Sequence, residues 1–116
     1  MACDERLVER IRVVLELRPR TNERRMFGGV CFTLNGNMVC GVVGTDLMVR
    51  VGPDRYQDAL QQPHVREMDF TGRAMKGYVF VGRQAIKNEL ALRHWIDLGA
   101  AYVGGLPAKA RVKQPS

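Results

Sequence analysis

The chain has 116 residues and a formal net charge of +6, with 46% hydrophobic and 26% charged residues. This length predicts one domain with an apolar core, and the composition argues against intrinsic disorder. No apolar run approaches the roughly 20 residues of a membrane span, and the start of the chain is unlike a secretory signal. We therefore expect a cytoplasmic protein with no membrane contact and with reduced cysteines. The basic charge favours an anionic partner.

The first predicted element is a helix over residues 4–17. Its apolar side chains recur at helical spacing and form one stripe, made of Leu7, Val8, Ile11, Val14 and Leu15. The acidic residues at its start suit the positive end of the helix dipole. Pro19 ends the helix, because the residue before a proline is disfavoured in helical geometry.

A hairpin follows, with Asn35-Gly36 between two β-prone runs. Both central positions of a type I′ turn need positive φ, and Asn-Gly supplies this most readily. This turn predicts the cross-strand pairs Leu34–Asn37, Thr33–Met38, Phe32–Val39 and Cys31–Cys40. A third strand is predicted over residues 47–51, where apolar and other residues alternate.

The second half predicts a short helix that begins near Pro53 and closes at Pro63, then a strand over residues 65–70. A loop over 71–77 leads to a strand over 78–81. The last helix begins at the N-cap Asn88 and runs to about Val103. The order α-β-β-β-α-β-β-α predicts an α+β class. We expect a two-layer sandwich with a mostly antiparallel five-stranded sheet and helices packed on one face.

Several motifs together resemble the N-terminal domain of the TfoX (Sxy) family. They are Arg25-Met26-Phe27-Gly28-Gly29, the hairpin with Gly36, the strand Leu47 to Val51, Met68-Asp69-Phe70, Gly72 to Val81 (GRAMKGYVFV) and Trp95. The resemblance covers roughly residues 7 to 108. We therefore divide the chain into a TfoX N-terminal-like domain at 1–108 and a basic mobile tail at 109–116.

The resemblance implies a two-layer α/β sandwich similar to secretion chaperones, with no enzymatic activity and no cofactor. It also implies a regulatory role linked to DNA-uptake competence. Full-length competence regulators of this family add a C-terminal domain of about the same size. We expect this chain, which stops at Ser116, to lack that domain.

The first candidate binding site joins Arg24 and Arg25 to Gly28 and Gly29. Backbone N–H groups beside glycines can cradle an anion, and arginine can grip phosphate with two hydrogen bonds. The stretch opens a strand, however, and lacks the spacing of a Walker loop. We favour a tight bend, with Met26 and Phe27 filling the core and the arginines in solvent.

The second candidate is a basic surface formed by Arg66, Arg73, Lys76 and Arg83 around the 71–77 loop, extended by the basic tail. Such charges would give salt-dependent nucleic-acid affinity without sequence preference. Interleaved aromatic residues are scarce, and no helix-turn-helix or zinc-finger spacing is present. Simple solvation of these charges is the favoured interpretation, and nucleic-acid binding is the alternative.

Catalytic and metal sites are not indicated by the residue types. The two histidines, His64 and His94, have no metal-ligand spacing, and the only serine is Ser116. Three cysteines without a C-x-x-C motif argue against a zinc cluster. We expect Cys31 and Cys40 to be facing thiols, with a cross-strand disulfide as the alternative.

The last candidate is a protein interface. The predicted register puts Cys31, Met38 and Val42 on the face of the hairpin opposite to Val30 and Phe32. Apolar groups on both faces suggest that the outer face is covered, and a second copy of the chain is the favoured partner. We therefore predict a non-catalytic regulatory or protein-interaction module that forms a homodimer.

Overall fold

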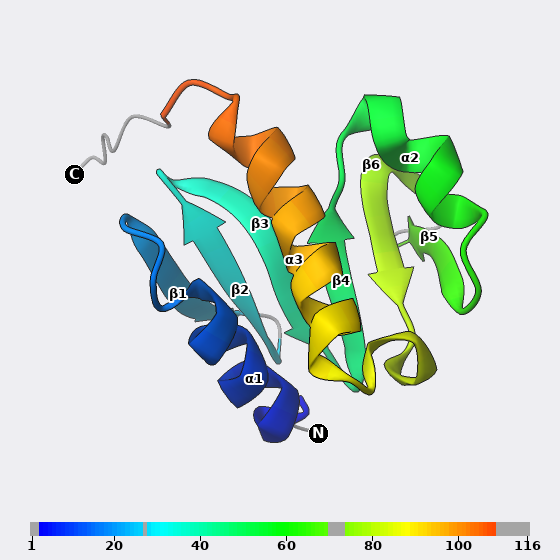
Figure 1. Ribbon diagram of the computed structural model, residues 1–116, viewed down its shortest axis with the longest axis horizontal. Coiled ribbons are helices and arrows are strands. Elements are labelled where there is room, and N and C mark those ends of the chain that lie inside the picture. Colours follow the sequence, from blue (N-terminus) through cyan, green and yellow to red (C-terminus); the bar gives the residue numbers. More distant parts are fainter. Residues whose placement is uncertain (1–2, 27, 70–73, 109–116) are drawn as a thin grey trace.

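The computed structural model describes residues 3–26, 28–69 and 74–108. The order of elements is α1 (Glu5–Leu15), β1 (Thr21–Met26), β2 (Gly29–Leu34), β3 (Asn37–Val43), β4 (Asp46–Arg50), α2 (Pro53–Leu60), β5 (Val65–Asp69), β6 (Ala74–Val81), the 3-10 helix η1 (Arg83–Ile86) and α3 (Glu89–Gly104). The strands form one antiparallel sheet of six strands in the order β1-β2-β3-β4-β6-β5. Figure 1 shows this arrangement.

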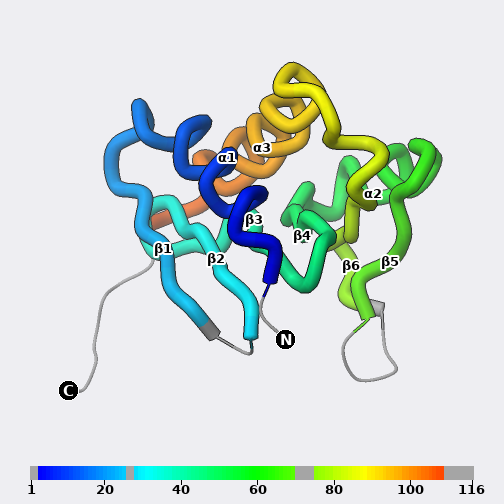
Figure 2. Tube along the Cα trace, turned by 90° about the horizontal axis from the view of Figure 1, so that it is seen from below, coloured from blue at the N-terminus to red at the C-terminus, as the bar shows by residue number. Residues whose placement is uncertain are grey.

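The predicted α+β class is confirmed, and so is the placement of the helices. Figure 2 shows α1, α2 and α3 on one side of the sheet, and no helix of the described residues lies on the opposite face, which we call the helix-free face. The sheet has six strands, however, where the sequence predicted five. The predicted loop over 71–77 is also too long, because β6 already begins at Ala74.

Helix α1 forms as predicted, with Asp4 as its N-cap. The Asp4 carboxylate accepts hydrogen bonds from the backbone N–H groups of Arg6 and Leu7, which would otherwise lack partners. The whole predicted stripe is buried against the sheet: Leu7, Val8, Ile11, Val14 and Leu15. The helix ends at Leu15, four residues before Pro19, with Glu16 as its C-cap.

Strand β1 is the strand that the sequence did not predict, and the short helix η1 was not predicted either. It pairs with β2 along its whole length, from Thr21 opposite Leu34 to Met26 opposite Gly29. Two ion pairs join it to α1: Arg12 to Glu23 at 2.7 Å and Arg25 to Glu5 at 2.9 Å. Polar and charged side chains occupy the side of β1 that faces the helix. The strand therefore lacks the alternation of apolar and polar residues by which a strand is predicted from sequence.

Helix α3 lies across the middle of the sheet and covers β3 and β4. Asn88 caps it, accepting a hydrogen bond from the backbone N–H of Ala91 at 2.8 Å. A Cβ built on Gly99 would lie 3.0 Å from the carbonyl oxygen of Val39, so glycine allows this helix to approach β3 closely. The predicted apolar side of the helix is buried: Leu92, Trp95, Ile96, Gly99 and Val103.

No helix in the described ranges is long and apolar enough to cross a membrane. The predicted mobile tail at 109–116 lies outside the described residues. The same holds for Phe27, for Arg73 and for the side chain of Met26, which were predicted to fill the core or to join the basic surface.

Candidate functional site

The helix-free face of the sheet carries its own apolar cluster. We call it the methionine–aromatic cluster and define it by Met38, Val43, Met48, Met68, Tyr78 and Phe80. Its centre is Met48, Met68 and Phe80, which are 2%, 3% and 7% exposed. Side chains alternate across a strand, so Met48 and Phe80 point away from the helices while Val49 and Val79 enter the main core.

Gly41 makes room for the centre of the cluster. It lies opposite Met48 on β4 and opposite Cys31 on β2. A Cβ at this position would lie 2.7 Å from the carbonyl oxygen of Val30 and 3.2 Å from the Met48 Cε. The absent side chain therefore leaves space that the Met48 thioether occupies.

Two arginines lie over the aromatic rings of this region. The Arg66 guanidinium carbon is 4.8 Å from the centroid of Phe80, and its Nη2 donates to the Asp46 carboxylate at 2.7 Å. The Arg50 guanidinium carbon is 5.5 Å from the ring centroids of both Tyr78 and Tyr102. Tyr102 lies on α3 and packs against the main core, so Arg50 contacts both the cluster and the helix layer. Stacked arginines cover apolar surface with their stems while their charge stays in water.

The predicted interface residues are divided between the two faces. Met38 belongs to the methionine–aromatic cluster, and Cys31 pairs with Gly41 beside it. Val42 does not share this face: it is fully buried in the core under the helices. The prediction failed because β2 and β3 change register between Phe32 and Thr33.

The same register change corrects the predicted cysteine pair. The turn itself is as predicted, because Asn35 and Gly36 have φ of 53° and 82° and Leu34 pairs with Asn37. Beyond the irregularity, Phe32 pairs with Cys40 and Cys31 pairs with Gly41. Cys40 therefore lies in the main core, where burial raises the pKa of its thiol. Burial also raises the pKa of the Cys31 thiol.

The two neighbouring arginines of the first candidate site point to different sides of β1. Arg25 forms two hydrogen bonds with the Glu5 carboxylate on the helix side, which hold the pKa of Glu5 below its ordinary value. Arg24 pairs across the sheet with Cys31, on the helix-free side. Gly28 has φ of 75° in the turn between β1 and β2, which fits the predicted bend.

The described residues of the predicted basic surface, Arg66, Lys76 and Arg83, do not come together. Arg66 lies on the helix-free face, paired with Asp46. Arg83 begins η1, beyond the opposite end of β6 from Lys76. Among the described residues, no three His, Cys, Asp or Glu side chains are placed to hold a metal ion.

Sequence reasoning missed most of the cluster, although a signal was present. In Tyr78-Val79-Phe80-Val81 the aromatic residues alternate with valines, and in Leu47-Met48-Val49 a methionine stands between aliphatic residues. If the valines face the helices, the larger side chains between them must share the opposite face.

Comparison with known families gives one match. The profile described as the TfoX N-terminal domain matches residues 14–102. The chain belongs to the TfoX N-terminal domain family. This match confirms the family that the motifs indicated. No curated protein and no solved structure gives a significant match.

Proposed function

We propose that this TfoX N-terminal domain is a non-catalytic interaction module whose working surface is the helix-free face. A second copy of the chain is the partner proposed first, and the cytoplasmic, competence-linked regulatory role implied by the resemblance belongs to the same proposal. One observation carries it. The methionine–aromatic cluster lies on a side of the sheet that no described helix covers.

The composition of the cluster suits a protein interface. Met38, Val43 and Tyr78 are partly exposed around a buried centre. Methionine adapts its shape to a partner, and Tyr, Met and Arg are enriched at protein interfaces. The partly exposed side chains can therefore bury further area against a flat apolar partner.

The charges on this face predict how self-association should depend on salt. Arg66 lies over the cluster and pairs with Asp46, and Arg50 lies beside Tyr78. Arg24 lies on the same face, on the edge strand β1. Two copies meeting through this face would bring like charges together. Because salt screens such repulsion, self-association through this face should strengthen as salt is added.

Sedimentation equilibrium of the wild type and of Met38→Asp tests the proposal. We expect a dimer that tightens with salt, and a monomer in the variant, because a buried unpaired carboxylate is costly. Leu90→Asp is the matched control: Leu90 is 80% exposed on α3, and its substitution should leave the dimer intact. A monomer at every protein and salt concentration would exclude the self-association.

A second candidate function uses the same face for single-stranded nucleic acid. The sequence placed this function on the 71–77 loop and the tail. The observation that favours the sheet face is the pair Tyr78 and Phe80 on one strand, each with an arginine over its ring. Aromatic rings on a sheet can stack bases while arginines hold the backbone. Tyr78 is partly exposed for such stacking, whereas Phe80, at 7% exposure, becomes available only if Arg66 moves off its ring.

The salt dependence distinguishes the two candidate functions. Binding to nucleic acid weakens steeply as salt increases, whereas self-association is expected to strengthen. Fluorescence anisotropy with a labelled single-stranded oligonucleotide would measure the nucleic-acid binding. We expect weaker binding in Arg50→Gln/Arg66→Gln than in Arg20→Gln/Arg55→Gln, which removes the same charge elsewhere. Flat anisotropy at low salt would eliminate this second function.

A further inference from the structure

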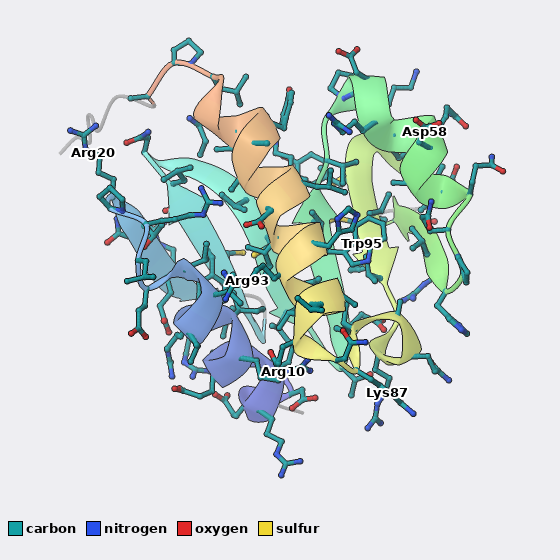
Figure 3. All side chains as sticks on the ribbon, viewed as in Figure 1. Arg10, Arg20, Asp58, Lys87, Arg93 and Trp95 are labelled. Carbon is teal, nitrogen blue, oxygen red and sulfur yellow. The ribbon has the colours of Figure 1, made fainter. Side chains whose placement is uncertain are left out.

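A second site lies away from the helix-free face, at the end of the molecule where α1 and α3 begin. A cleft of about 490 Å³ opens between the first turns of α1, the β3–β4 turn at Thr45, and η1. Leu7 and Ile86, which are 3% and 1% exposed, contribute its apolar lining. Figure 3 shows Arg10 between the adjoining ends of the two helices and Lys87 beside η1.

Four cations from two segments line this cleft: Arg6 and Arg10 on α1, and Arg83 and Lys87 at the two ends of η1. Of these, Arg6, Arg83 and Lys87 have no ion-pair partner within the described part of the chain. Each of the three is therefore available to form a contact ion pair with an anion.

The acids of the cleft are already engaged. Asp4 caps α1 through its carboxylate. Glu9 accepts from Arg12 at 2.8 Å, and Glu89 accepts from Arg10 Nε at 2.9 Å. The Glu9 and Glu89 side chains remain 64% and 70% exposed, but each is paired with an arginine. Among the described residues, the cleft therefore has three cations and one carboxylate, Asp4, that form no ion pair.

Arg10 is held in one orientation by the backbone. Its Nη2 donates to the carbonyl oxygens of Ile86 at 2.6 Å and Lys87 at 3.3 Å, while its Nε is fixed by Glu89. Nη1 donates to no described residue. A planar guanidinium fixed along one edge presents its remaining N–H groups without a further loss of side-chain freedom.

We propose that this cleft binds a phosphate-bearing anion, with Arg83 and Lys87 as charge contacts and Arg10 Nη1 as the oriented donor. Phosphate fits because arginine contacts its oxygens in pairs. The cleft is many times the roughly 30 Å³ that one water occupies in the liquid, so a polyphosphate or a phosphorylated small molecule fits better than a single small ion. The N-terminal ends of α1 and α3 add a favourable field.

Isothermal titration calorimetry with inorganic pyrophosphate tests the site. We expect saturable binding in the wild type and a loss of roughly tenfold or more in Arg83→Gln/Lys87→Gln, the scale of one or two charge-assisted hydrogen bonds. The matched control Arg20→Gln/Arg55→Gln removes the same charge from other surfaces and should retain the affinity. Equal losses in both variants, or no binding to the wild type, would overturn the proposal.

A further variant tests the location of the site without removing any of its cations. Thr45→Glu adds a carboxylate to an exposed turn at the cleft and should reduce pyrophosphate binding by repulsion. Retained wild-type affinity in Thr45→Glu would contradict the assigned location.

The same titrations with a short oligonucleotide identify the source of the phosphate. If Arg83→Gln/Lys87→Gln loses pyrophosphate binding and retains DNA binding, the ligand is a small phosphorylated molecule. If it loses both, the cleft takes a backbone phosphate of a nucleic acid.

Discussion

The two faces of the sheet are built from the same strands but packed in different ways. The helix side holds β-branched and aliphatic side chains that are fully buried, such as Val49, Val79 and Ile96. The opposite side holds a small cluster of methionine and aromatic residues partly covered by arginines. The first face is covered by three helices, whereas within the described ranges no helix covers the second, where arginine side chains lie over the aromatic rings. A surface covered in this way can open to a partner without unfolding the domain.

Truncating one buried side chain on each face of the sheet should give the largest changes in the free energy of unfolding. We expect Ile96→Ala to lower the free energy of unfolding by about 4 kcal/mol, and Met48→Ala to lower it by about 2 kcal/mol. The difference arises because helix and sheet cannot close over the cavity at Ile96, whereas arginine stems and Met38 can move over the cavity at Met48. Urea unfolding of both variants measures it. A larger loss for Met48→Ala would contradict the contrast between the faces.

Thiol labelling compares the same two environments at Cys31 and Cys40. Cys31 is partly exposed, whereas Cys40 is fully buried and reacts only through opening of the core. We expect Cys31 to be labelled faster by roughly 100-fold, because local opening requires several kcal/mol. Mass spectrometry of timed alkylation reads both sites. An intramolecular Cys31–Cys40 disulfide after mild oxidation would show that the predicted pairing, and not the observed register, is correct.

The smallest effect on the free energy of unfolding is expected from removing an ion pair between β1 and α1. The Arg12 guanidinium keeps the pKa of Glu23 below its ordinary value of 4.5. The stability from this pair is therefore present above pH 4.5 and is lost as the pH falls through the lowered pKa. Glu23→Gln should be less stable than wild type at neutral pH, and the gap should close in acid. Urea midpoints across this range measure the gap, and a constant gap would refute the assignment.

Much of this fold was predictable because its elements follow simple periodicities. The stripe of α1, the Asn35-Gly36 turn and the N-cap Asn88 are local signals, and each predicted its element correctly. Strand β1 was missed because its helix side is made of ion-pairing residues such as Glu23 and Arg25. Its place in the sheet depends on α1, which a local pattern does not reveal.

The candidate sites were less predictable, because they depend on register and on contacts distant in sequence. One irregularity between Phe32 and Thr33 moved Val42 from the predicted interface into the core. The position of Arg66 over Phe80 required the pairing of β5 with β6. The cleft beside Arg10 joins α1 to η1, which lie more than 70 residues apart along the chain.

The most direct test of the proposed working surface is a dilution series of methionine-methyl NMR spectra. Met38, Met48 and Met68 belong to the methionine–aromatic cluster, whereas Met75 is 39% exposed outside it and serves as the internal control. Self-association through the helix-free face predicts that the three cluster methyls shift with protein concentration while Met75 does not. Cluster resonances that stay fixed at every concentration, with or without added salt, would contradict it.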